Sequence, residues 1–167
     1  MQQLESDLKT INDYIPGLLG SLLWPALAAA VGGGATAASV KEWYPTLEKP
    51  SFNPPASIFG PVWTVLYTMM GIADHIVAQK GDTENVNNAR TIYRIQLGLN
   101  TLWSVLFFGR RSPIAGLINI VVLWVAILMT VVAFARISRL AALLLVPYLL
   151  WSTFAMVLNA AIWRLNR

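Results

Sequence analysis

The sequence predicts an all-α membrane protein, a bundle of five transmembrane helices. Of its 167 residues, 56% are hydrophobic and only 12% are charged, which leaves more apolar surface than a soluble domain of this size can bury. The apolar residues form stretches that are each about as long as the roughly 20 residues a helix needs to cross a bilayer. These five stretches cover residues 15–39, 58–79, 92–108, 113–135 and 140–164.

A polar N-terminal tail, residues 1–14, precedes the first stretch, and its acidic residues outnumber its one lysine. The tail lacks the positive start of a secretory signal, so residues 15–39 are expected to stay in the mature protein. Within them, the run 28–35 places alanines and glycines four residues apart, a spacing that lets helices approach closely in lipid. Close packing is the favoured interpretation of this run, and a groove against a flat ligand is the alternative.

The connection at residues 40–57 differs from the others. It holds four prolines together with several aromatic residues, and proline forbids a regular helix and favours extended or turn backbone. Long loops of this kind more often serve a function than a plain connection. We therefore expect a lid over the bundle, with an inert rigid cap as the alternative. The lid residues are Tyr44, Pro50, Phe52, Pro54 and Pro55.

The later connections are plain. Residues 80–91 are read as a polar loop, 109–112 as a tight turn before a proline, and 136–139 as a short basic turn. Lysines and arginines divide equally between the two faces that these connections define. The sequence therefore does not predict which face is cytoplasmic.

Tryptophan positions indicate where a site lies. Tryptophan prefers the membrane interface, yet Trp63 and Trp103 are expected about 8 Å inside the face that carries the loop, given the rise of 1.5 Å per helical residue. Trp151 lies deeper. Together with Trp43 and Phe59, these rings can surround a cavity beneath the loop that suits a large, flat, hydrophobic ligand. Simple filling of space between helices is the alternative.

Polar residues within the apolar stretches are few. Asn100, Asn119 and Asn159 fall on the third, fourth and fifth stretches, where we expect hydrogen bonds between helices of about 1 kcal/mol each, with ligand orientation as the alternative. Asp74 and His75 diverge by about 100° on a helix and lie about one turn from its end. They are expected at the membrane interface; the alternative is axial ligation of a metalloporphyrin by His75.

Several classes of chemistry are excluded by composition. The chain has no cysteine, one histidine and no acidic residue after Glu84, so a disulfide framework, a thiolate nucleophile and a cysteine or multi-histidine metal site are ruled out. No catalytic residue, metal ligand or required cofactor is predicted. The basic residues are dispersed rather than clustered, which argues against a nucleic-acid partner and leaves the lipid bilayer as the expected surroundings.

Several sequence motifs of the chain resemble the signature of the TspO/MBR family. The resemblance covers roughly residues 17–166 in order. It rests on Trp43-Tyr44, Lys49-Pro50, Phe59-Gly60-Pro61-Val62-Trp63, Asn100, Trp103, Phe107-Phe108-Gly109, Pro147-Tyr148-Leu149, Trp151, Phe154, Leu158-Asn159 and Trp163.

This resemblance implies a five-helix membrane bundle, usually a homodimer, whose cavity opens toward the first loop. The implied ligands are porphyrins such as protoporphyrin IX and drug-like aromatic compounds. Sterol binding is doubtful, because the tyrosine positions of the motif in animal members are Ala160 and Ala161 here. A bacterial member in a bacterial membrane is therefore expected. The implied ligand-binding residues are Trp43, Phe59, Trp63, Asn100, Trp103, Trp151, Phe154, Ala155 and Leu158.

Three functions remain open at this point. The leading hypothesis is a tetrapyrrole sensor or transporter that binds porphyrin beneath the first loop. The second is an enzyme that degrades bound porphyrin in light, with Trp63 or Trp151 as the redox partner. The third is a structural dimeric membrane protein without a small ligand.

Overall fold

The computed structural model describes the backbone of residues 2–167 and the side chains of residues 14–167. Its regular structure is entirely helical, and the described residues contain no strand. A 3₁₀ turn, η1 (Tyr44–Thr46), lies in the first loop, and a π-helical turn, η2 (Val105–Gly109), continues the third helix. The long helices are α1 (Gln2–Glu42), α2 (Ala56–Ala78), α3 (Glu84–Ser104), α4 (Pro113–Ala135) and α5 (Arg139–Leu165).

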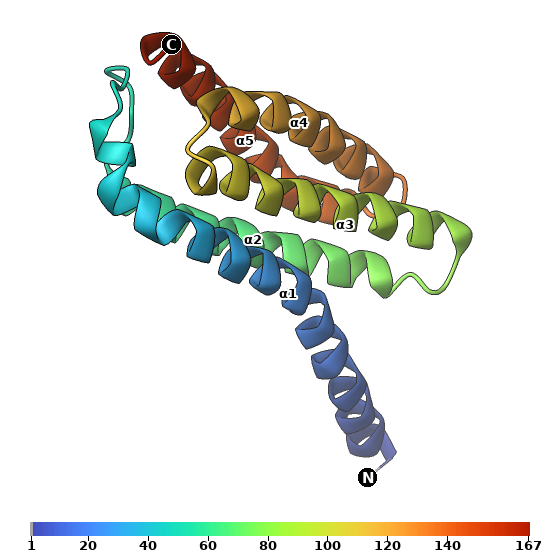
Figure 1. Cartoon of the computed structure of the whole chain (residues 1–167). Helices are drawn as coiled ribbons and strands as arrows, with labels where there is room; N and C mark the ends of the chain where they lie inside the picture. The colour runs from blue at the N-terminus through green and yellow to red at the C-terminus, as the bar shows by residue number, and fades with distance from the viewer. Residues whose placement is uncertain (1) are drawn as a thin grey trace.

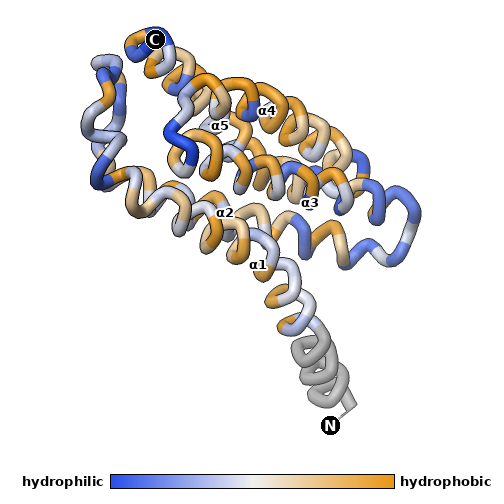
Figure 2. The backbone as a smooth tube through the Cα atoms, viewed as in Figure 1, coloured by the Kyte–Doolittle hydropathy of each residue, from blue (hydrophilic) through white to orange (hydrophobic). Residues whose placement is uncertain are grey.

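Four of the five helices are long and apolar enough to cross a membrane. They are α1 from Tyr14 onward, α2, α4 and α5. Figure 2 shows that polar segments gather at the two ends of the bundle, with mostly apolar chain between them. Large apolar side chains such as Leu19, Ile118 and Leu143 remain more than 60% exposed, as expected where the surrounding solvent is lipid rather than water.

The helices run up and down beside one another. Helix α1 packs on α2 and α3, α2 packs on α5, and α4 packs on α3 and α5. Figure 1 shows that the first loop, the turn between α3 and α4, and the C-terminus meet at one end of the bundle. The α2–α3 and α4–α5 turns lie at the other end. This end is called the far end below.

Serine and threonine caps fix where three helices begin. Thr83, Ser112 and Ser138 each accept a hydrogen bond from the backbone N–H three residues on, at 3.3 to 3.4 Å, which satisfies an N–H group that has no partner within the helix. Thr83 places the start of α3 at Glu84, so the expected polar loop at residues 80–91 was wrong. The first turns of α3 are amphipathic, with Val86 and Ala89 buried, and a search for apolar runs misses such turns.

Two glycines mark the closest helix contacts. A Cβ atom on Gly71 of α2 would lie 3.1 Å from the Cα of Leu22 in α1, and one on Gly116 of α4 would lie 3.0 Å from the Cβ of Phe107. In the glycine run of α1, only Gly32 has a near neighbour, the Oγ of Ser104 at 3.1 Å. Close packing of that run is therefore confirmed at Gly32, while the tightest approach of α1 to α2 occurs elsewhere.

Candidate ligand-binding cavity

A partly open cavity of about 520 Å³ lies beneath the first loop, between α1, α2, α3 and α5. Its size falls in the range typical of small-molecule sites, about 300 to 1,000 Å³. Its aromatic wall comes from four parts of the chain: the loop, α2, the α3–η2 segment and α5. The aromatic residues that line it are Tyr44, Phe59, Trp63, Tyr67, Trp103, Phe107, Phe108 and Trp151.

Contacts between rings hold these side chains in place. Trp63 stacks on Tyr67 one helical turn away, with ring centroids 5.3 Å apart. Trp103 stacks on Phe107 at 5.4 Å, and the ring of Trp151 lies 5.9 Å from Phe59. Offset and edge-to-face aromatic pairs are favourable beyond simple area burial. Each tryptophan of the wall is therefore fixed by a neighbouring ring.

Helix α1 forms the opposite wall, which is small in its middle, at Ala26, Ala29, Gly32, Gly33 and Thr36, and bulkier at Leu22, Pro25 and Val40. Gly33 lines the cavity, and a Cβ atom there would have no neighbour within 4 Å. The small residues in the middle of this face leave open space at Gly33. For the glycine run at residues 28–35, the less favoured interpretation was a groove. That interpretation agrees with the open space at Gly33, on the side of α1 that lines the cavity.

Almost all polar groups of the lining already have protein partners. The hydroxyls of Thr36, Thr64 and Thr68 donate to backbone carbonyls of their own helices at 2.7 to 3.0 Å. Trp103 donates its Nε1–H to the Oδ1 of Asn159 at 3.1 Å, and Tyr67 donates to the Oδ1 of Asn100 at 2.6 Å. Among the described residues, none that line the cavity carries a charge. The cavity therefore offers rings and oxygen acceptors, and it offers few free donors.

The predicted site residues fall into two groups. Phe59, Trp63, Trp103, Trp151, Ala155 and Leu158 line the cavity. Three others do not, and they lie just behind it: Trp43 packs edge-on against Phe107 at 5.5 Å, Phe154 packs on Trp151 at 5.4 Å, and Asn100 lies under Tyr67. Their positions support the lining rather than form it.

The predicted lid is tied to the end of α5. Of its residues only Tyr44 lines the cavity, and its hydroxyl donates to the Oδ1 of Asn53 at 2.7 Å. Burial raises the pKa of the Tyr44 hydroxyl, and the hydrogen bond to Asn53 partly offsets this. Asn166 accepts from the Glu48 N–H and donates to the Glu48 carbonyl, each at 2.9 Å. Pro50, Phe52, Pro54 and Pro55 lie outside the lining, although Phe52 reaches the ring of Phe154 at 6.4 Å.

Several lining residues were missed by the sequence analysis. Tyr67 follows Trp63 by four residues, so helical spacing alone was enough to find it. Phe107 lines the cavity from the π-helical turn that ends at Gly109, and π-helical turns occur frequently at functional sites. Asn159 was noted only as a polar residue of α5, and its amide both accepts from Trp103 and donates to the Pro113 carbonyl at 2.8 Å.

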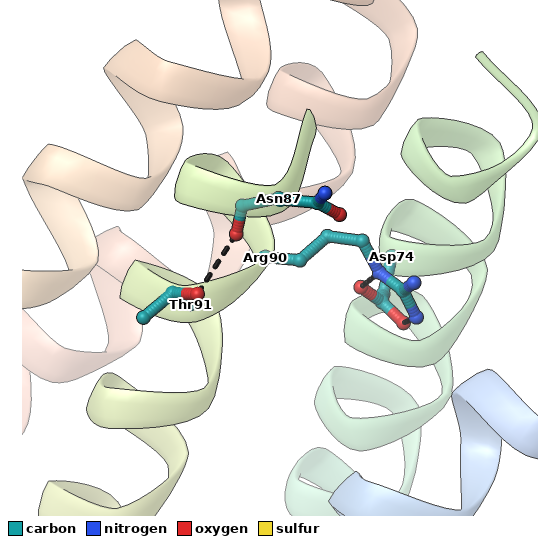
Figure 3. A network of polar contacts seen from close by, with 4 residues as sticks. All are labelled: Asp74, Asn87, Arg90 and Thr91. Atoms are coloured by element: carbon teal, nitrogen blue, oxygen red, sulfur yellow. Dashed lines mark hydrogen bonds and ion pairs between the residues drawn. The ribbon is translucent and has the colours of Figure 1, made fainter. Parts of the chain in front are cut away.

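Asp74 and His75 are buried between helices, a feature that the sequence did not predict. Each is only 1% exposed, because the early start of α3 covers Asp74 and α1 covers His75. Arg90 of α3 donates two hydrogen bonds to the Asp74 carboxylate at 2.8 and 2.9 Å, as Figure 3 shows. His75 packs edge-on against Tyr14 at 4.4 Å. His75 does not line the cavity, so axial ligation by it has no support there.

This architecture defines a class: a multi-pass integral membrane protein with an aromatic cavity inside its helix bundle. The chain belongs to the TspO/MBR family, whose model matches residues 21–164. It is 49% identical to the "Tryptophan-rich protein TspO" of Chlorobaculum tepidum over 84% of this chain and 90% of that one. It is 39% identical to the "Tryptophan-rich sensory protein" of Cereibacter sphaeroides, over 86% and 91% of the two chains. For the human "Translocator protein" the identity is 37%, over 92% and 91%.

Proposed function

We propose that this protein binds a flat, hydrophobic tetrapyrrole of the protoporphyrin IX type beneath the first loop and acts as a tetrapyrrole sensor or carrier. The observation that carries the proposal is the uncharged cavity of about 520 Å³ with rings on one side and small residues on the other. A flat macrocycle can stack on the rings while its other face meets the mostly small residues of α1. Relatives named for sensing and translocation favour the sensor or carrier role.

The lining also favours a particular form of the macrocycle. An ionised carboxylate buried without a partner is strongly unfavourable, so the acidic side chains of a porphyrin would stay at the mouth by the loop. None of the described lining residues is a histidine, methionine, lysine or cysteine, and the hydroxyls of the two lining tyrosines, Tyr44 and Tyr67, already donate to Asn53 and Asn100, so no ready ligand for a porphyrin metal lines the cavity. The hydroxyl oxygens of Tyr67 and the threonines retain acceptor capacity for pyrrole N–H groups. We therefore expect metal-free rings to bind in preference to metalloporphyrins.

The proposal includes a fifth span, α3. This helix does not reach the hydropathy of the other four, because it carries Arg90, Arg94, Gln96 and Asn100. The position of α3 in the chain indicates that it spans the membrane nevertheless. It begins at the far end directly after α2 and ends at the loop end directly before α4 (Figure 1). Gln96 and Asn100 face protein, since each is only 1% exposed, whereas Arg94 is exposed and lies over the ring of Trp24 at 5.6 Å. A helix that packs on neighbours along its polar face can present its remaining apolar face to lipid.

Titration of the purified protein with protoporphyrin IX in the dark tests the proposal, with quenching of tryptophan fluorescence as the signal. Gly33→Leu should weaken binding at least about tenfold, because the new side chain fills the cavity where a Cβ has open space. Gly34→Leu is the matched control, since Gly34 also has open space and does not line the cavity. Saturable quenching that Gly33→Leu abolishes and Gly34→Leu keeps supports the proposal. Quenching that neither variant changes contradicts it.

Light-dependent degradation of bound porphyrin is the second candidate function. The observation in its favour is that Trp63 and Trp151 both line the cavity, with Trp63 stacked on Tyr67. Two adjacent oxidisable rings would be in contact with an excited ligand. Turnover in light, measured at saturating porphyrin against free porphyrin in detergent, separates this candidate from binding alone.

A further inference from the structure

Helix α3 presents about one polar group per turn to the interior of the bundle. Arg90, Tyr93, Gln96 and Asn100 follow one another at intervals of three or four residues, and Trp103 continues the row at the cavity wall. Such intervals place side chains on one face of a helix. These five residues are called the polar stripe below. Polar side chains at membrane depth are costly, and they frequently mark paths for water, protons or ions.

Both ends of the polar stripe are paired within the protein. At the far end, Arg90 reaches across to Asp74 of α2 with two hydrogen bonds (Figure 3). Toward the cavity, Asn100 accepts from Tyr67 at 2.6 Å and donates to the hydroxyl of Tyr148 in α5 at 3.1 Å. Tyr67 itself lines the cavity. The stripe therefore runs from a buried ion pair to the floor of the ligand site.

The middle of the polar stripe is not paired in this way. The hydroxyl of Tyr93 and both amide atoms of Gln96 have no hydrogen-bond partner among the described residues, although Tyr93 is 0% and Gln96 1% exposed. A buried polar group left without a partner costs about 1 to 3 kcal/mol. Three such atoms on neighbouring turns of one helix are a site for a polar occupant.

The spacing of the polar stripe identifies that occupant. With a rise of 1.5 Å per residue, the backbone positions of Arg90, Tyr93 and Gln96 are spaced by about 4.5 Å along the helix axis, and that of Asn100 lies about 6 Å further. A water molecule that bridges two polar atoms spans up to about 6 Å, because each hydrogen bond is about 2.8 to 3.0 Å long. An amide and a phenol supply too few oxygens to replace the shell of a metal ion. Neighbouring members of the stripe are thus close enough along the helix for their side chains to share a water molecule.

We propose that the polar stripe of α3 binds a chain of internal water molecules that joins the Asp74–Arg90 pair at the far end to the Asn100 network under the cavity floor. The water molecules pair with Tyr93 and Gln96, and Tyr67 links them to the cavity through Asn100. The chain gives water a route into the middle of the bundle from the far end. This site is separate from the ligand cavity and does not depend on which ligand the cavity takes.

Solid-state NMR on the unaltered protein in lipid bilayers tests this proposal directly. With ¹⁵N-labelled glutamine and asparagine, transfer of magnetisation from water to side-chain amides is measured, and Gln96→Leu identifies the Gln96 signal. The matched control is Asn119, a buried amide whose Nδ2 donates to the Leu99 carbonyl at 2.9 Å. The Gln96 amide should receive magnetisation at least ten times faster than Asn119. A rate no higher than that of Asn119 would overturn the proposal.

The accessibility of introduced cysteines tests whether water reaches the polar stripe. The chain has no cysteine of its own, so each variant carries a single reactive thiol. Thiols react as thiolates, which form readily only where water reaches them. Single variants Gln96→Cys, Ile95→Cys on the lipid side and Leu97→Cys in the packed core are exposed to Ag⁺ in vesicles, and unreacted thiol is counted after denaturation. Position 96 should react at least tenfold faster than 95 and 97.

Sidedness decides where the water enters. Cysteines placed at Asp82 in the α2–α3 turn and at Thr46 in the first loop report which end faces the added reagent. Reaction at position 96 should be faster when Ag⁺ is added at the Asp82 side. Equal rates at positions 95, 96 and 97, or reaction only from the Thr46 side, would contradict a route from the far end.

Discussion

The two ends of the helix bundle are built from the same helices, yet one is hollow and the other is filled. Under the first loop, rings from three helices face the glycines of α1 across a cavity. At the far end, Asp74 and His75 are buried, an arginine pairs with the acid, and Gly71 brings α1 against α2. In lipid, helices associate through close packing and polar contacts rather than through the hydrophobic effect. We therefore expect the far end to contribute more than the loop end to the stability of the bundle, although Gly116 and Phe107 also pack closely near the loop end.

Removing the buried carboxylate should produce the largest effect. Asp74→Ala leaves the Arg90 guanidinium without its partner inside the bundle, and loss of one member of a buried pair costs about 3 to 5 kcal/mol. Because Arg90 is 24% exposed, we expect the lower end of that range. The free energy of unfolding in detergent measures it, and the dissociation constant for porphyrin should change less than about twofold.

A second ion pair supplies the control for this comparison. Arg111 and Glu42 meet at 3.0 Å near the loop end, with side chains 50% and 68% exposed. Exposed pairs contribute about 0 to 1 kcal/mol, so Glu42→Ala should change the free energy of unfolding by less than about 1 kcal/mol. Similar losses for both variants would refute the idea that the far end contributes more to stability than the loop end.

Substitutions at two glycines compare close packing toward the far end with open space at the cavity. Gly71→Ala adds a methyl group 3.1 Å from the Leu22 backbone and closer still to its side chain, and overpacking of this kind costs about 1 to 3 kcal/mol. Gly33→Ala adds a methyl group with open space around it, and alanine is favoured over glycine within a helix by about 0.5 to 1 kcal/mol. Thermal unfolding should shift down for the first variant and slightly up for the second. Unfolding temperatures that shift in the same direction for both variants would contradict the difference in packing between Gly71 and Gly33.

The hollow end was largely predictable from sequence, and the filled end was not. Trp63, Trp103 and Trp151 stood out because tryptophan is unusual so deep in a membrane, and hydropathy placed the helices that carry them. Arg90 lay in an expected loop, because apolar runs cannot reveal the amphipathic start of α3. Asp74 and Arg90 lie sixteen residues apart, and without knowing that α3 begins at Glu84 nothing in the sequence brings them together.

The tryptophans of the cavity decide between binding and chemistry. A ligand held by ring contacts needs shape, so Trp63→Phe and Trp151→Phe should each weaken porphyrin binding by about 1 to 2 kcal/mol from lost ring area. Phenylalanine is far harder to oxidise than tryptophan, so any light-dependent turnover that uses either ring as electron donor should collapse even with porphyrin bound. Turnover at saturating porphyrin is the measurement.

If both phenylalanine variants keep full turnover, Trp63 and Trp151 line the cavity but do not act as electron donors. Wild-type turnover no faster than that of free porphyrin in detergent would exclude the enzyme hypothesis altogether. Trp24 is a suitable control, because it lies outside the cavity and is 47% exposed on α1. Trp24→Phe should leave both binding and turnover unchanged.

The tether between the first loop and α5 should affect binding more than stability. Asn166→Ala removes both hydrogen bonds to Glu48, each worth about 0.5 to 1.5 kcal/mol at most, and releases the loop that carries Tyr44. If the loop acts as a lid, porphyrin should dissociate several-fold faster while the unfolding temperature stays nearly constant. Asn166→Asp keeps acceptance from the Glu48 N–H but sets a carboxylate oxygen against the Glu48 and Ile162 carbonyls to which the amide donates, so it should release the loop at least as much as alanine does. Equal losses of binding and stability would make the loop a structural cap.

The smallest expected effect is that of pH on the loop. Tyr44 is the lid residue that lines the cavity, and burial raises the pKa of its hydroxyl above the ordinary value. Below pH 10 the hydroxyl is neutral in both the folded and the unfolded chain, so this residue contributes no pH dependence there. Above pH 10 the unfolded chain releases the proton more readily than the folded one, so stability should decline as pH rises further. Because Tyr44 stays neutral over this range, it should cause no change in porphyrin affinity between about pH 6 and 9.

Tyr44→Phe separates the hydrogen bond to Asn53 from the ring. The phenyl ring keeps the cavity wall and the contact with Phe107 at 6.5 Å, and the lost hydrogen bond costs about 0.5 to 1.5 kcal/mol. We expect a loss of porphyrin affinity of no more than about tenfold, and no decline of stability above pH 10 from this position. If the variant keeps the alkaline decline of the wild type, another tyrosine causes it. If it loses binding altogether, the Tyr44 hydroxyl contacts the ligand itself, and the loop end recognises its ligand by a polar group as well as by shape.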